Sequence, residues 1–152
     1  MSHEPLRSLT ILLADDDEDD RLLTGEAISE SQLDGQLHCV ADGEELMQYL
    51  KRAGAYSQVA APRPDIILLD LNMPRKDGRE ALREIKADAT LRSIPVVVLT
   101  TSKAEEDILR TYDLGVNSFI TKPVTYKELV EVMSALNNYW AQTVQLPHHY
   151  TP

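Results

Sequence analysis

The sequence predicts an α/β fold in which a doubly wound parallel sheet of five strands is covered by helices on both faces. Short β-rich runs alternate with segments of helical period along the chain, which is the order of strand–helix–strand units. Three of these runs, ending at Ala14, Asp70 and Thr100, are almost continuously apolar. Such runs are typical of strands buried on both faces of a sheet.

The five predicted strands differ in composition, which predicts their places in the sheet. They are Leu9–Ala14, Leu37–Val40, Ile66–Asp70, Val96–Thr100 and Ser118–Thr121. The second and fifth are short and mixed, so we expect them at the edges. The single cysteine, Cys39, excludes a disulfide within the chain, and its apolar neighbours in the second strand predict a buried thiol.

Five helix starts are marked by a capping residue followed three positions later by an acid. The pairs are Asp17 and Asp20, Asp42 and Glu45, Asp77 and Glu80, Ser102 and Glu105, and Thr125 and Glu128. In such a pair the capping side chain accepts a hydrogen bond from a free backbone amide, and the acid favours the positive end of the helix. The sequence therefore predicts five helices.

Composition favours one domain that binds neither nucleic acid nor membrane. The chain has 152 residues, 43% of them hydrophobic, which suffices for one core. We expect a domain over residues 9–141, an N-terminal extension over 1–8 and a tail over 142–152. The net charge of −10 repels phosphates and anionic lipid. Because no signal peptide or membrane-length apolar run is present, we expect a cytoplasmic protein.

Acidic residues gather where the predicted strands end. Six acids in a row, Asp15 to Asp20, follow the first strand, and Asp70 ends the third. We assign Asp17 to Asp20 to the cap and first turn of a helix. Asp15 and Asp16 face Asp70 across the carboxyl edge, where uncompensated carboxylates repel one another. Mg²⁺ suits such a site because it takes oxygen ligands and is commonly shared with phosphate. The alternative is that both acids are simply solvated.

Two further polar residues belong to the same predicted edge. Thr100 ends the fourth strand and Lys122 follows the fifth, so a hydroxyl and an amine should join the carboxylates. Taken alone, Thr100 is also a common strand former and Lys122 an ordinary surface amine.

At these positions the chain resembles the receiver domain of two-component response regulators, over about residues 9 to 140. The motifs that carry the resemblance are the pair Asp15 and Asp16, LLDLNMPRKDG at 68–78, VVVLTTS at 96–102 and FITKP at 119–123. The resemblance implies the flavodoxin-like receiver fold with strand order 2-1-3-4-5.

The resemblance also implies the roles of individual residues. Asp70 would be the phosphoacceptor, and Lys122, Thr100 and Phe119 would be the catalytic and switch residues that respond to the phosphoryl group. The implied ligands of Mg²⁺ are Asp15, Asp16, Asp70 and the backbone carbonyl of Asn72. Phosphoryl transfer depends mainly on positioning and charge neutralisation, which this set supplies.

The end of the chain resembles a narrower group of receivers. Its sequence, NYWAQTVQLPHHYTP at 138–152, is similar to the extension of stand-alone receivers paired with bacterial phytochrome histidine kinases. The implied partners are a phytochrome sensor kinase and an unidentified downstream protein. The tail is too apolar for a purely solvated segment, so we expect it to build a homodimer. The alternative is that it folds back on its own last helix.

The sequence thus predicts a single-domain response regulator that accepts a phosphoryl group on Asp70, and not an enzyme that turns over substrates. Three alternatives are a Mg²⁺-dependent aspartyl-nucleophile phosphohydrolase, a flavin carrier and a non-phosphorylated scaffold. Such hydrolases usually carry a second Asp two positions after the nucleophile, where this chain has Asn72. A flavin phosphate would be repelled by the acidic turn after the first strand.

Overall fold

The fold was analysed in a computed structural model that describes residues 9–31, 35–58, 61–71, 73–100, 118–121 and 125–136. The strands are β1 (Leu9–Ala14), β2 (Gly35–Val40), β3 (Ile66–Leu69), β4 (Val96–Thr100) and β5 (Ser118–Thr121). The helices are α1 (Glu18–Glu30), α2 (Gly43–Lys51), the 3₁₀ helix η1 (Gly54–Tyr56), α3 (Gly78–Ala87) and α5 (Tyr126–Leu136). The helix predicted from Ser102, the extension 1–8 and the tail 142–152 lie outside the described residues.

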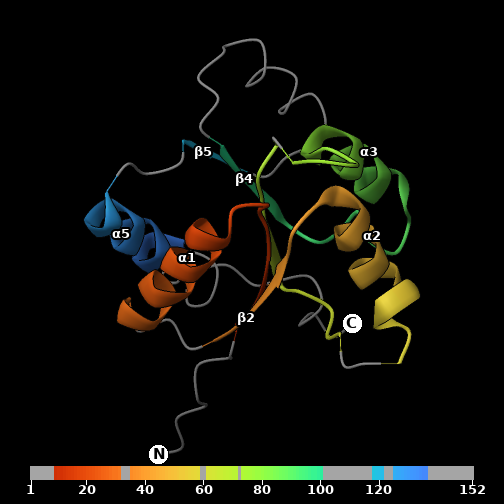
Figure 1. Cartoon of the computed structure of the whole chain (residues 1–152). Helices are drawn as coiled ribbons and strands as arrows, with labels where there is room; N and C mark the ends of the chain where they lie inside the picture. The colour runs from red at the N-terminus through yellow and green to blue at the C-terminus, as the bar shows by residue number, and fades with distance from the viewer. Residues whose placement is uncertain are drawn as a thin grey trace, which may run out of the picture.

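The strands form one parallel sheet in the order β2-β1-β3-β4-β5, which confirms the predicted architecture. The two strands that were predicted to be short and mixed, β2 and β5, are its edges, as expected. Figure 1 shows α1 and α5 together on one side of the sheet and α2 and α3 on the other. Both faces are therefore covered, and the sites of such a sheet lie at its carboxyl edge.

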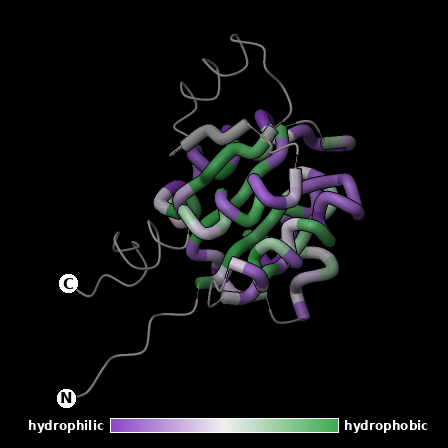
Figure 2. Tube along the Cα trace, turned by 90° about the vertical axis from the view of Figure 1, so that its left-hand side faces the viewer, coloured by the Kyte–Doolittle hydropathy of each residue, from purple (hydrophilic) through white to green (hydrophobic). Residues whose placement is uncertain are grey.

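The hydrophobic core is divided by the sheet into two clusters, because successive side chains of a strand point to opposite faces. In β1, Leu12 and Ala14 belong to the cluster under α2 and α3, whereas Leu9, Ile11 and Leu13 belong to the cluster under α1 and α5. Strands β3 and β4 alternate in the same way. Figure 2 shows these hydrophobic strands inside a more hydrophilic periphery. This double burial fixes the register of the central strands.

Helix capping follows the sequence prediction at the four α-helices described. The Asp17 carboxylate accepts hydrogen bonds from the N–H groups of Asp19 and Asp20 at 2.8 and 3.3 Å. The same arrangement occurs in the remaining pairs, Asp42 with Glu45 at 2.8 Å, Asp77 with Glu80 at 3.0 Å and Thr125 with Glu128 at 3.2 Å. Each cap satisfies an amide that the helix leaves unpaired.

Strand β2 departs from the prediction in two respects. It begins at Gly35, two residues before the predicted start, because its pairing with β1 extends down to Leu9. Its cysteine, Cys39, is exposed, so the prediction of a buried thiol was wrong. As an edge strand, β2 is only partly covered: Leu37 packs against the core cluster under α1, and Cys39 at the far end does not.

Within the described ranges no helix is long and apolar enough to cross a membrane.

Candidate functional site

The pairing of β1 with β3 carries two acids to the same point on the carboxyl edge of the sheet. Ala14 and Leu69, the last residues of the two strands, are direct partners. The next residue of each strand remains in the ladder, because Asp70 donates its N–H to the Ala14 carbonyl at 2.9 Å and Asp15 donates to the Val40 carbonyl at 3.1 Å. Backbone hydrogen bonds therefore hold both acids at the edge.

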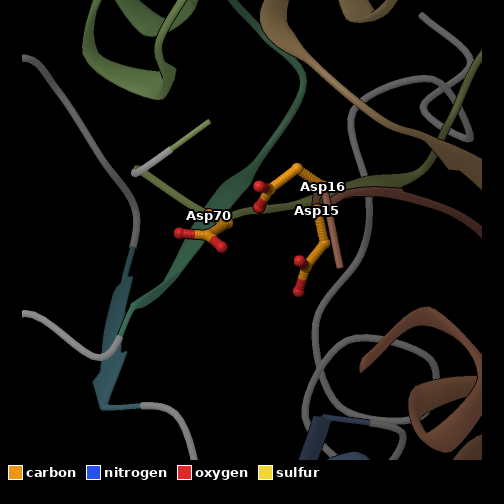
Figure 3. A group of neighbouring side chains, drawn as sticks. All are labelled: Asp15, Asp16 and Asp70. Atoms are coloured by element: carbon orange, nitrogen blue, oxygen red, sulfur yellow. The ribbon is translucent and has the colours of Figure 1, made fainter. Parts of the chain in front are cut away.

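Three carboxylates meet at this edge, as the sequence predicted for its acidic residues. One oxygen from each of Asp15, Asp16 and Asp70 lies within 4.8 Å of the other two. Figure 3 shows the three carboxyl groups around a common point. Asp15 and Asp70 are 1% and 8% exposed, whereas Asp16 is exposed. The cluster thus has a buried base and one side open to solvent.

The start of α1 fixes Asp15 through two contacts. The N–H of Asp17 donates to the Asp15 carboxylate at 3.0 Å, and the guanidinium of Arg21 donates to the Asp15 backbone carbonyl at 2.7 Å. The second contact holds the peptide that joins Asp15 to Asp16, so Arg21 orients both acids. Arg21 was not among the site residues predicted from the sequence. Its place one turn into an acid-rich helix start could have suggested the contact, because helical side chains point toward the N-terminus.

Asp70 is packed from behind by the first residue of α3. The N–H of Gly78 donates to the Leu71 carbonyl at 2.9 Å. A Cβ atom at Gly78 would lie 2.4 Å from the Asp70 carbonyl oxygen and 2.7 Å from the Leu71 Cα, both backbone atoms that cannot rotate away. Glycine is therefore required here by close approach of two backbones. The position of α3 and the position of Asp70 depend on each other.

The donor set fits a small, hard divalent cation. All three groups offer carboxylate oxygens, the ligands that Mg²⁺ prefers. Ligands around one Mg²⁺ at about 2.1 Å lie roughly 3 to 4.2 Å apart, so oxygens already within 4.8 Å need only small side-chain rotations to share one ion. The open side beside Asp16 leaves room for water or for phosphate oxygens as further ligands.

The other predicted site residues are placed only by their backbones or lie outside the described residues. Thr100 ends β4 directly opposite Thr121 of β5, and Phe119 is the partner of Val98. The end of β5 thus lies beside the end of β4, and the residue after Thr121 is Lys122. Lys122 itself and Asn72 lie outside the described residues.

Comparison with known families identifies the domain. The family model of the response regulator receiver domain matches residues 11–134. The chain belongs to this family. The acidic cluster lies at the carboxyl edge of the receiver domain, and the match includes every residue that the sequence analysis assigned to the site.

Several known receivers are similar to this chain over almost its whole length. Response regulator Rcp1 of a Synechocystis species is 43% identical over 147 residues, which cover 97% of this chain and 99% of Rcp1. The crystal structure of the phosphorylated cyanobacterial phytochrome response regulator RcpA is 45% identical, covers 93% of this chain and 99% of its own, and gives a TM-score of 0.85. The Mn²⁺-bound form of Rcp1 is 43% identical, covers 91% and 99%, and gives a TM-score of 0.82.

We expect Asp16→Asn to weaken Mg²⁺ binding by about tenfold or more, because it removes one charge from the ligand set while leaving the buried pair in place. Isothermal titration calorimetry measures the affinity. The matched control is Asp19→Asn, an exposed acid of the same run outside the cluster, which should change the affinity less than about twofold because its charge is screened. Equal effects of the two substitutions would contradict a specific site.

Proposed function

We propose that this receiver domain is a phosphorylation switch in which Asp70 accepts a phosphoryl group from the phosphohistidine of a sensor histidine kinase. The observation that carries the proposal is the cluster of Asp15, Asp16 and Asp70 at the carboxyl edge of the sheet. Asp70 directly follows β3, the central strand of the sheet, with β1 on one side and β4 on the other. Of the three acids, Asp70 is the one that lies between the ends of two neighbouring strands, β1 and β4.

Phosphoryl transfer to Asp70 requires little covalent chemistry from the other residues of the protein. A carboxylate oxygen of Asp70 forms the new O–P bond as the N–P bond of the phosphohistidine breaks, and the histidine nitrogen keeps the electron pair. Such a step depends on in-line positioning and on charge neutralisation. In the proposal, Asp15, Asp16, Asp70 and the Asn72 carbonyl would hold Mg²⁺, and the ion would supply positive charge near the phosphoryl oxygens. In the proposal, Lys122 supplies a second positive charge.

The alternatives to a switch are disfavoured by particular residues. A phosphohydrolase with an aspartyl nucleophile usually places a second Asp two positions later, and here that residue is Asn72. A flavin phosphate would be repelled by the acidic residues that follow β1. We therefore propose that the protein is not a turnover enzyme and that its only phosphate chemistry is the gain and loss of the group on Asp70. The Mn²⁺-bound form of Rcp1 supports a divalent ion at the site.

We expect Asp70→Asn to abolish the incorporation of acid-labile phosphate, both from a kinase and from a small acyl phosphate, because an amide does not act as the nucleophile. Phosphoprotein gels with acid treatment measure the incorporation. Because Asn matches Asp in shape, we expect the variant to fold like the unsubstituted chain. The thermal unfolding midpoint is the control that checks this. Undiminished labelling of Asp70→Asn would refute the assignment of the phosphoacceptor.

The kinase we propose is a phytochrome. The support is that RcpA, 45% identical to this chain, is a cyanobacterial phytochrome response regulator. The light-absorbing bilin would belong to the kinase. Because a phosphohistidine domain must approach Asp70 closely, its docking surface should lie beside the site. This encounter would take place in the cytoplasm.

An exposed apolar pair lies near the site on α1. Leu22 and Leu23 are 61% and 40% exposed, and because they are adjacent in sequence they place apolar surface together on α1. They lie five and six residues after the cap Asp17, about 7 to 9 Å along the helix axis. We propose that the kinase covers this pair when it delivers its phosphoryl group.

Replacing both leucines, Leu22→Asp with Leu23→Asp, should lower the rate of transfer from the kinase about tenfold or more, because truncating apolar anchors of an interface costs over 1 kcal/mol each. Rapid-quench labelling measures this rate. Labelling by a small acyl phosphate should stay within about twofold, since that donor needs no docking surface. Equal losses with both donors would show that the substitutions damage the site instead.

The output of the switch is proposed to pass through β4 and β5. Thr100 would bond to the phosphoryl group and Phe119 would change its position, and both residues lie on these adjacent strands. A ligand shifts a protein between two states only through contacts that differ between them. The receptor of this change would be a separate downstream protein.

The tail, residues 142–152 after a receiver domain at 9–141, is proposed to build a homodimer. The support is the apolar and aromatic composition of the segment and the frequency of two-fold dimers among oligomers. Light scattering should give a dimer for the intact chain at micromolar concentration and a monomer for a chain truncated after Ala141. A monomeric intact chain would refute the dimer, and a dimeric truncated chain would refute the role of the tail.

A further inference from the structure

We infer that Lys76 and Glu84 are positioning residues of the phosphoacceptor site, which clamp the loop that leads from Asp70 to α3. This inference rests on the proposed function, because it assigns the clamp to the metal and phosphate chemistry at Asp70. The loop comprises residues 71–77, between β3 and α3. It begins directly after the proposed phosphoacceptor and includes Asn72, the proposed carbonyl ligand of the metal.

The end of the loop nearest Asp70 is held by α3. Gly78 bonds to the Leu71 carbonyl at 2.9 Å, and its Cα is so close to the Asp70 carbonyl that no Cβ fits between them. Any shift of α3 along the sheet would therefore press on the backbone of Asp70 or open this contact. The rigidity of the Asp70 backbone therefore depends on how firmly α3 is held against the sheet.

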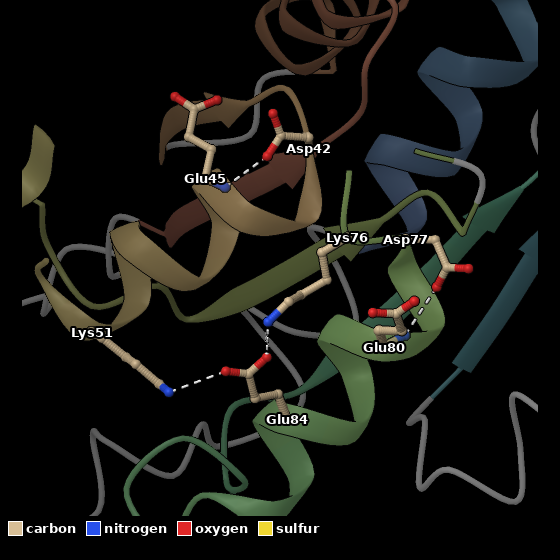
Figure 4. A network of polar contacts seen from close by, with 7 residues as sticks. All are labelled: Asp42, Glu45, Lys51, Lys76, Asp77, Glu80 and Glu84. Carbon is tan, nitrogen blue, oxygen red and sulfur yellow. Dashed lines mark hydrogen bonds and ion pairs between the residues drawn. The ribbon is translucent and has the colours of Figure 1, made fainter. Parts of the chain in front are cut away.

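The far end of the loop is held at Lys76 by both its main chain and its side chain. Its carbonyl accepts a hydrogen bond from the N–H of Gly43, the first residue of α2, at 2.9 Å. A Cβ at Gly43 would lie 2.0 Å from that carbonyl oxygen, so α2 and the loop are in backbone contact. The Lys76 ammonium donates to the Glu84 carboxylate of α3 (Figure 4). One residue thus joins α2, the loop and α3.

Glu84 completes the clamp from the middle of α3. Its second oxygen accepts from Lys51 of α2 at 3.2 Å. The hydrogen bond from Lys76 is the main cause that lowers the pKa of Glu84. Gly78 and Glu84 stand on the same helix, so a bond at Glu84 fixes the element that touches Asp70.

The ion pairs are too exposed for the clamp to serve mainly stability. The side chains of Lys76, Glu84 and Lys51 are 28%, 34% and 46% exposed. Partly exposed pairs of this kind contribute little to the free energy of unfolding. Their geometric effect is larger, because catalytic groups must be held within a fraction of an ångström. Loss of the clamp should therefore change the Mg²⁺ affinity and the labelling rate of the site more than the free energy of unfolding.

The test compares Lys76→Met and Glu84→Gln with Lys51→Met in the full chain. Lys51 shares the same carboxylate but does not belong to the loop, which makes it the matched control. The readouts are the Mg²⁺ dissociation constant from calorimetry, the initial rate of labelling by a small acyl phosphate, and the urea midpoint of unfolding.

We expect Lys76→Met and Glu84→Gln to weaken Mg²⁺ binding and slow labelling about threefold to tenfold, somewhat less than the loss of a group that touches a metal ligand directly. Lys51→Met should change both less than about twofold. Lys76→Arg keeps the charge and should recover most of the loss. The urea midpoints of all variants should stay close to that of the unsubstituted chain.

The inference is overturned if Lys76→Met and Lys51→Met have the same Mg²⁺ affinity and the same labelling rate, or if the losses follow the unfolding midpoint. Failure of the proposed function has a different signature, because the unsubstituted chain would then take up no phosphate or Asp70→Asn would label fully. Mg²⁺ binding needs no phosphoryl transfer, so that measurement judges the clamp in either case.

Discussion

The pairing of β1 with β3 brings two buried carboxylates to the same edge of the sheet, and the chemistry proposed for the domain depends on that constraint. Ala14 opposite Leu69 leaves Asp15 and Asp70 no other position. The free energy that holds them there comes from the two apolar clusters on the faces of the sheet. Because burial of the central strands fixes where their ends lie, the fold holds three carboxylates together in an arrangement that suits a divalent cation.

Each acid of the cluster is oriented by a different covering element. Helix α1 orients Asp15 through the Asp17 amide and the Arg21 guanidinium, and α3 fixes the backbone of Asp70 through Gly78. The two helices lie on opposite faces of the sheet. A site built in this way is preorganised by the fold as a whole. A shift in the position of either helix should therefore alter metal binding and phosphoryl transfer, even where the shifted residues do not contact the metal or the phosphoryl group.

The sequence predicted the local elements, the strand order and the edge where the acids meet, but it did not predict particular side-chain contacts and exposures. Strands β1, β4 and β5 have the predicted bounds, and the described helix caps use the predicted residues, because both patterns are complete within a few neighbouring residues. The meeting of Asp15, Asp16 and Asp70 followed from the carboxyl-edge rule for parallel sheets. The exposure of Cys39 did not follow, since composition does not show how far α1 covers an edge strand. The contact between Lys51 and Glu84 also did not follow, because it joins residues 33 positions apart and only the packing of α2 on α3 creates it.

The strand order explains how one phosphoryl group can be delivered by one protein and sensed by another. Asp70 ends β3, between β1 with its acids and α1 on one side and β4 with Thr100 on the other. A kinase that covers Leu22 and Leu23 would approach from the β1 side. On the opposite side of Asp70 lies the end of β4, and β5 follows it at the edge of the sheet. In the proposed function, delivery and response would therefore use different neighbours of the same carboxylate, so a downstream protein would read β4 and β5 while the proposed docking surface on α1 stays separate.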